Sequence, residues 1–128
     1  MNKTVAILLA TGVLGTLFIG GVLGFFMMQR ARSAEALAVE ARLAEIRRRI
    51  EAATVYPPMA RLRRLEGEAL VRFDIAEDGT PDAIEVHRSS GLPSLDRAAS
   101  AAVRDAAPLP WVYGRLEVPV RFALEARR

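Results

Sequence analysis

The first pattern along the chain is an unbroken apolar run, Val5–Met28, in which Thr11 and Thr16 are the only polar side chains. As a helix this run would extend roughly 36 Å at 1.5 Å per residue. That exceeds the roughly 20 residues that cross a hydrocarbon core. The run is also longer than the apolar core of a signal peptide, about 7–15 residues. We therefore expect residues 1–29 to form an uncleaved transmembrane anchor.

Small residues recur every four positions within this run, at Gly12, Thr16, Gly20 and Gly24. This spacing places them on one ridge, where another membrane helix can approach closely. Glycine is common in membrane helices in any case, so the alternative is a ridge without a partner. The run holds no ionisable side chain, and the membrane segment alone could therefore not relay protons. We expect a helix-packing face for membrane proteins in the lipid bilayer.

Residues 30–54 continue the helical pattern without Pro or Gly and are rich in good helix formers. Apolar side chains at three-four spacing form a seam of Val39, Leu43, Ile46 and Ile50. The seam is shorter than a coiled coil requires, so we expect it to dock on a partner, with self-association as the alternative. Ion pairs Glu45–Arg49 and Arg47–Glu51 are expected on this helical stalk.

The spacing of apolar residues changes after Tyr56-Pro57-Pro58, where proline ends the helix. The expected elements are a short helix Pro58–Arg64, strand Glu68–Ile75, an Asp78-Gly79 hairpin turn, strand Asp82–Arg88, a helix from Ser94 to Ala106 capped by Ser94, and strand Leu116–Leu124. Residues 55–128 therefore predict an α+β domain with two helices and a three-stranded antiparallel sheet.

Two details of this domain carry further expectations. Pro119 lies inside the last strand, and because proline lacks an amide donor this strand is expected at a sheet edge. Trp111 and Tyr113 precede that strand. We expect them to close one end of the core, with an aromatic anchor at an interface as the alternative.

Composition argues against several classes of function. The net charge of +3 is spread along the chain, which disfavours nucleic-acid binding, and there is no cysteine. His87 stands alone on a polar face, and Ser89-Ser90 lacks a catalytic His–Asp arrangement. Asp74, Asp78 and Asp82 loosely resemble a calcium-binding spacing, but the loop lacks the length and the glutamate at position 12 that such a site needs. We expect no enzymatic activity, no cofactor and no metal site.

Six segments in order resemble the TonB C-terminal domain family: Tyr56-Pro57-Pro58, Leu65–Phe73, Asp78-Gly79, Arg88–Gly91, Leu95–Ala99 and Val118–Phe122. The resemblance implies a bacterial inner-membrane protein with a cytoplasmic N-terminus and a periplasmic C-terminal domain, although the flanking charges alone favour the opposite orientation. It also implies that a partner peptide adds as a strand to the last strand's edge. The implied binding residues are Leu116, Val118, Val120 and Phe122, with Tyr56 and Pro57 at the start of the domain.

Three departures from the family pattern bear on function. The membrane run lacks a Ser-xxx-His pair, a short helix replaces a long Pro-rich linker, and Asp105–Pro108 replaces an aromatic-basic run. We therefore expect an accessory or scaffolding subunit docked to a larger membrane complex, such as a respiratory or photosynthetic one. The alternative is a TonB-type energy transducer that couples an inner-membrane proton-driven motor to outer-membrane transport.

Overall fold

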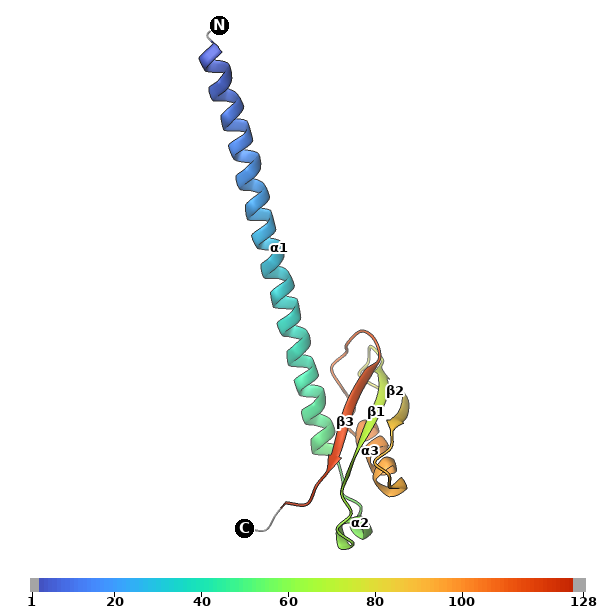
Figure 1. Ribbon diagram of the computed structural model, residues 1–128. Helices are drawn as coiled ribbons and strands as arrows, with labels where there is room; N and C mark the ends of the chain where they lie inside the picture. Colours follow the sequence, from blue (N-terminus) through green and yellow to red (C-terminus); the bar gives the residue numbers. More distant parts are fainter. Residues whose placement is uncertain (1–2, 126–128) are drawn as a thin grey trace. The chain divides into compact units, whose positions relative to one another are not determined.

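The computed structural model describes the backbone of residues 3–125 and the side chains of residues 20–125. In chain order, its elements are α1 (Lys3–Ala53), α2 (Pro58–Leu62), β1 (Gly67–Ile75), β2 (Pro81–Arg88), α3 (Pro93–Asp105) and β3 (Leu116–Phe122) (Figure 1). The chain divides into two compact units, Met1–Ala38 and Val39–Arg128, and α1 runs through both.

The first unit holds the N-terminal part of α1. Among the described residues, no helix has both the length and the apolar character needed to cross a membrane. Much of the predicted span Val5–Met28, including Gly12 and Thr16, has side chains outside the described residues. A Cβ placed on Gly20 or Gly24 would meet nothing within 4 Å. The membrane anchor and its packing ridge therefore stay predictions.

The second unit is built on a three-stranded antiparallel sheet with strand order β2-β1-β3. Val71 in the central strand lies opposite Val86 in β2 and Val118 in β3. Side chains alternate between the two faces of a strand, and every second residue of β1 from Ala69 to Ile75 is buried. The predicted α+β class and antiparallel three-stranded sheet are thereby confirmed.

One hydrophobic core lies on the buried face of this sheet. Its largest fully buried side chains are Phe73, Phe122, Ile46, Ile50, Leu95, Val71 and Val103. They come from β1, β3, the C-terminal part of α1 and α3. The buried residues of α3 are Leu95, Ala99, Ala102 and Val103, and the small side chains of Ala99 and Ala102 let this helix lie close to the sheet.

The predicted bounds of two helices are wrong. Ser94 is not the N-cap of α3, because the helix already begins at Pro93 and Leu92 occupies the cap position. Proline suits the first helical position, where the missing amide has no helical partner to lose. The short α2 likewise ends at Leu62, before the predicted Arg64.

The last strand ends at Phe122, two residues before the predicted Leu124. Phe122 pairs with Gly67, the first residue of β1, so no further partner is left in the ladder. The amide of Leu124 instead donates to a carboxylate oxygen of Glu66 at 2.7 Å.

The aromatic pair before β3 does not fill the core. Trp111 is 44% exposed and Tyr113 is 88% exposed. Leu109 and Val112 take the buried positions in this loop. The prediction that Trp111 and Tyr113 close the core is therefore wrong, since the loop turns its aliphatic side chains inward and its aromatic ones outward.

Candidate partner-binding groove

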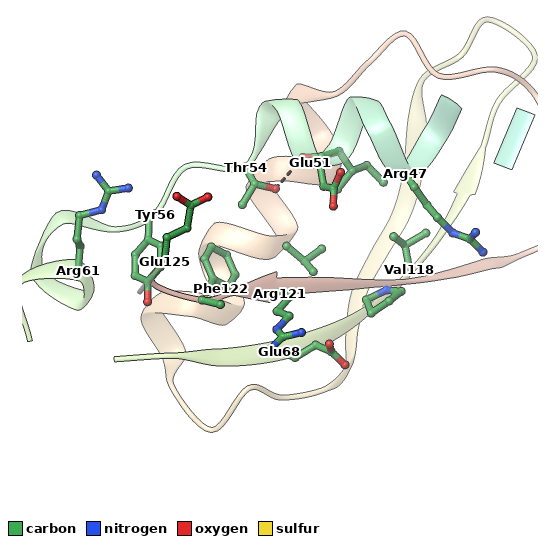
Figure 2. Close-up of a pocket in the computed structure, with 14 residues that line it drawn as sticks. Arg47, Glu51, Thr54, Tyr56, Arg61, Glu68, Val118, Arg121, Phe122 and Glu125 are labelled. Carbon is green, nitrogen blue, oxygen red and sulfur yellow. Dashed lines mark hydrogen bonds between the residues drawn. The ribbon is translucent and has the colours of Figure 1, made fainter. Parts of the chain in front are cut away.

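A groove with a volume of about 660 Å³ follows the outer side of β3 (Figure 2). Within the part of the chain that the structure describes, β3 pairs with β1 on one side and with no strand on the other. The residues that line the groove are Arg47, Ile50, Glu51, Thr54, Tyr56, Arg61, Glu68, Val118, Pro119, Val120, Arg121, Phe122, Ala123 and Glu125. The groove thus has one wall from the end of α1 and one from β3.

The backbone of β3 determines which hydrogen-bonding groups face its free side. Pro119 cannot donate a hydrogen bond, and proline in a sheet fits where its amide position faces away from the neighbouring strand. Successive residues of a strand direct their amide and carbonyl groups to alternate sides. The amides of Glu117 and Arg121 therefore face the free side, and those of Val118 and Val120 face β1. The free edge is a ready template for an added strand.

The predicted edge residues occupy the inner side of this strand. Val118, Val120 and Phe122 are buried in the core, and Leu116 is half-buried. Glu117, Pro119 and Arg121 alternate with them and are exposed. The sequence prediction thus missed Pro119 and Arg121 as groove residues, although the alternation of apolar and polar residues places them on the opposite face.

The stalk seam lies largely within the domain itself. Ile46 is fully buried and Ile50 is 2% exposed, and both belong to the core. Leu43 packs against that core as a half-buried side chain, and Val39 is half-exposed. These contacts hold the last turns of α1 beside β3, and the seam's expected role in docking to a partner stays a prediction.

On α1, Glu45 forms ion pairs outside the groove, whereas Arg47 and Glu51, which line it, form none among the described residues. Glu45 contacts Arg48 and Arg49, each at 2.7 Å. The hydrogen bond from Arg48, with that from Arg49, lowers the pKa of Glu45 to about 2. The predicted Arg47–Glu51 pair is absent from the ion pairs among the described residues. Instead, the Arg47 side chain extends from α1 toward β3, and the Glu51 carboxylate lies on the side of α1 that faces β3 (Figure 2).

Tyr56 closes one end of the groove. Its hydroxyl donates a hydrogen bond to the Leu65 carbonyl, and its ring stands edge-on to that of Phe122. The guanidinium of Arg61 lies 5.5 Å from the centre of the Tyr56 ring. Pro57, the other residue predicted at the start of the domain, precedes α2 at its N-cap position. Tyr56 thus joins the end of α1 to the end of β3.

The other polar residues considered in the sequence are exposed or form local hydrogen bonds. His87 is exposed on β2. Both serine hydroxyls, of Ser89 and Ser90, donate to the carboxylate of Asp96 near the start of α3. Asp78 accepts the amide of Thr80 within the hairpin turn. No group of three or more potential metal ligands occurs among the residues that the structure describes.

The fold and the groove define a class of protein: a small α+β interaction domain with a free strand edge beside a helix. The family model for the Gram-negative bacterial TonB protein C-terminal domain matches residues 52–125. The chain therefore belongs to the TonB C-terminal family, and the resemblance expected from the sequence is confirmed.

Individual relatives agree with this assignment. Protein TonB of Helicobacter pylori strain 26695 is 36% identical over 86 residues, which cover 65% of this chain and 30% of that protein. Protein TonB of Haemophilus influenzae is 41% identical over 58 residues, covering 45% of this chain and 22% of that protein. This chain thus spans less than a third of the length of these relatives.

A solved structure has the same fold. The solution structure of the Helicobacter pylori TonB C-terminal domain aligns with a TM-score of 0.60 at 34% identity. The alignment covers 66% of this chain and 82% of that one.

Proposed function

We propose that the free side of β3 binds an extended segment of a partner protein as an added strand, within a TonB-type energy transducer. The observation that carries the proposal is the groove of about 660 Å³ beside an edge strand that has no strand on its outer side in the described chain. Main-chain hydrogen bonds to such an edge supply affinity, and side-chain contacts supply specificity. The partner would be an outer-membrane transporter, and the power source would be a proton-driven motor in the inner membrane.

Membership in the TonB C-terminal family and similarity to TonB proteins support the transducer over the scaffold expected from the sequence. The family match covers residues 52–125 and does not include the apolar run Val5–Met28. A scaffolding subunit of a larger membrane complex is the second candidate. It is favoured by the lack of any ionisable side chain in that run. No enzymatic role is proposed.

The proposal includes a place in the cell. Val5–Met28 would anchor the chain in the inner membrane, with the N-terminus in the cytoplasm and the second unit in the periplasm. The length of the apolar run supports the anchor. Protease added to intact spheroplasts should then digest the second unit without lysis, and protection of this unit from the protease would contradict the orientation.

The experiment that tests the function is purification of the intact chain in mild detergent, followed by mass spectrometry of what co-purifies. Recovery of inner-membrane motor proteins together with an outer-membrane transporter is the expected result. Recovery of respiratory or photosynthetic subunits without motor proteins would overturn the transducer and favour the scaffold.

A matched pair of variants tests the strand edge in the same experiment. Arg121→Pro removes an amide that faces the free side, whereas Arg121→Ala removes the side chain and keeps that amide. We expect the proline variant to lose the transporter and keep the motor proteins, with the alanine variant retaining both. Equal recovery of the transporter by the two variants would contradict strand addition at β3.

A further inference from the structure

We propose that Arg47 and Glu51 select the partner through two ion pairs with the added strand. Arg47 would pair with an acidic side chain and Glu51 with a basic one, two positions apart on the same face of that strand. This inference rests on the proposed addition of a strand to β3. It assigns specificity to α1, whereas the backbone of β3 supplies the hydrogen bonds.

The position of α1 allows Arg47 and Glu51 to contact the side chains of an added strand. Ile46 and Ile50 anchor the helix in the core on the buried face of the sheet. A strand added to β3 would lie about 4.8 Å from it. Its side chains on that face would then point toward the last turns of α1, into the groove that Arg47 and Glu51 line. In Figure 2 the Arg47 side chain extends from α1 toward β3, and the Glu51 carboxylate lies on the side of α1 that faces β3.

The spacing of the two charges matches that of a strand. Residues four apart on a helix are about 6 Å apart along its axis. Residues two apart on a strand share a face and lie about 6.8 Å apart. One side chain of the added strand can therefore meet Arg47 while the next on the same face meets Glu51.

Both charges are available for a partner. Neither Arg47 nor Glu51 belongs to an ion pair among the described residues, whereas Glu45 is occupied by Arg48 and Arg49. Both side chains are exposed, so each is accessible to an opposite charge on the added strand.

The order of the charges gives the site a direction. Arg47 lies beside Val118, and Glu51 lies further along the groove toward Phe122 (Figure 2). A strand parallel to β3 would then carry its acidic residue first and its basic residue two positions later, and an antiparallel strand would carry them in the reverse order. The opposite order would place like charges together, and such repulsion is an effective means of excluding wrong partners.

The test is selection of a displayed library of random nine-residue peptides on the intact chain in detergent. We expect enrichment of peptides with an acidic and a basic residue two positions apart, in one order along the bound strand. In the double variant Arg47→Glu, Glu51→Arg the preferred order should reverse. The change in relative enrichment should be roughly tenfold, because two exposed ion pairs become two repulsions.

A matched double variant on the same helix controls for net charge and helix stability. Glu40→Arg with Arg42→Glu exchanges two exposed charges that do not line the groove, and it should leave the preferred order unchanged. Selected peptides without a charge order, or an order insensitive to the Arg47/Glu51 exchange, would overturn this inference and leave strand addition intact. Enrichment no greater than on Arg121→Pro would overturn both.

Discussion

The ring of Tyr56 stands edge-on to the ring of Phe122, with 5.6 Å between the ring centres and 85° between their planes. Tyr56 follows the end of α1, and Phe122 is the last residue of β3. The contact therefore joins the two walls of the groove at one end. Edge-to-face pairs are favourable beyond the area that they bury, so this pair stabilises the fold and the shape of the groove together.

Variants of Tyr56 should separate the contribution of its ring to stability from that of its hydroxyl. Tyr56→Phe keeps the ring and removes the hydrogen bond to the Leu65 carbonyl, which should lower the free energy of unfolding by about 1 kcal/mol. Tyr56→Leu should cost more, because it also removes the aromatic pair. In urea denaturation, a double-mutant cycle with Phe122→Leu should give a coupling of about 0.5–1.5 kcal/mol. Additive effects of the two substitutions would contradict the predicted coupling.

Gly79 should be far less tolerant of alanine than Gly91, although both have a positive φ, at 88° and 89°. The left-handed conformation costs an alanine about 1–2 kcal/mol at either position. At Gly79 a Cβ would also meet the Leu109 carbonyl oxygen at 2.8 Å, whereas at Gly91 it would meet nothing within 4 Å. Thermal unfolding should therefore show a distinctly larger loss for Gly79→Ala. Equal losses would mean that the hairpin and the Leu109 loop separate at little cost.

The part of α1 inside the second unit should be as important for stability as the sheet. Ile50→Ala removes a side chain that is 2% exposed in the core, which should lower the free energy of unfolding by about 2–5 kcal/mol. Leu37→Ala on the same helix removes a side chain that is 71% exposed and should change it by less than about 0.5 kcal/mol. Similar effects of the two substitutions on chemical denaturation would show that the helix is only a tether.

The sequence predicted the sheet and α3 well because their alternation and helical spacing are local signals. Phe73 and Val103 are fully buried, at positions that the strand alternation and the helical spacing share with other apolar residues. The end of β3 was missed because it depends on where β1 begins, at Gly67, which is a matter of pairing between distant segments. Trp111 was placed wrongly because hydrophobicity alone does not decide which side of a loop turns inward.

The groove was only partly predictable for the same reason. Pro119 indicated an edge strand, and the structure places β3 at the edge of the sheet. The second wall could not be inferred, since the helical spacing of Ile46 and Ile50 shows a docking face without showing what it docks on. The helical spacing of Arg47 and Glu51 predicts a surface ion pair. That β3 lies beside this part of α1 depends on tertiary packing, which the spacing does not show.

The start of α3 should make the stability of the protein depend on acid pH through Asp96. Partial burial alone would raise the pKa of this carboxyl, but hydrogen bonds from the hydroxyls of Ser89 and Ser90 and from the amide of Ser90 outweigh it and hold the pKa below the usual 3.8. The folded protein therefore binds this proton less readily than the unfolded chain. The resulting stabilisation is fully present above about pH 4 and is lost as the pH falls through the lowered pKa of the folded state.

Asp96→Asn should remove this dependence. At pH 7 the free energy of unfolding of the variant should be lower by about 1 kcal/mol. Hydrogen bonds to a charged acceptor are stronger than those to a neutral one, and the half-buried position of the site limits the effect. The difference from the natural chain should shrink as urea denaturation is repeated toward pH 2, because a growing fraction of Asp96 is then protonated. Asp105→Asn changes an exposed carboxyl at the other end of α3 and serves as the matched control. A difference for Asp96→Asn that stays constant from pH 7 to pH 2 would show that the Ser89–Ser90 loop does not depend on the charge of Asp96.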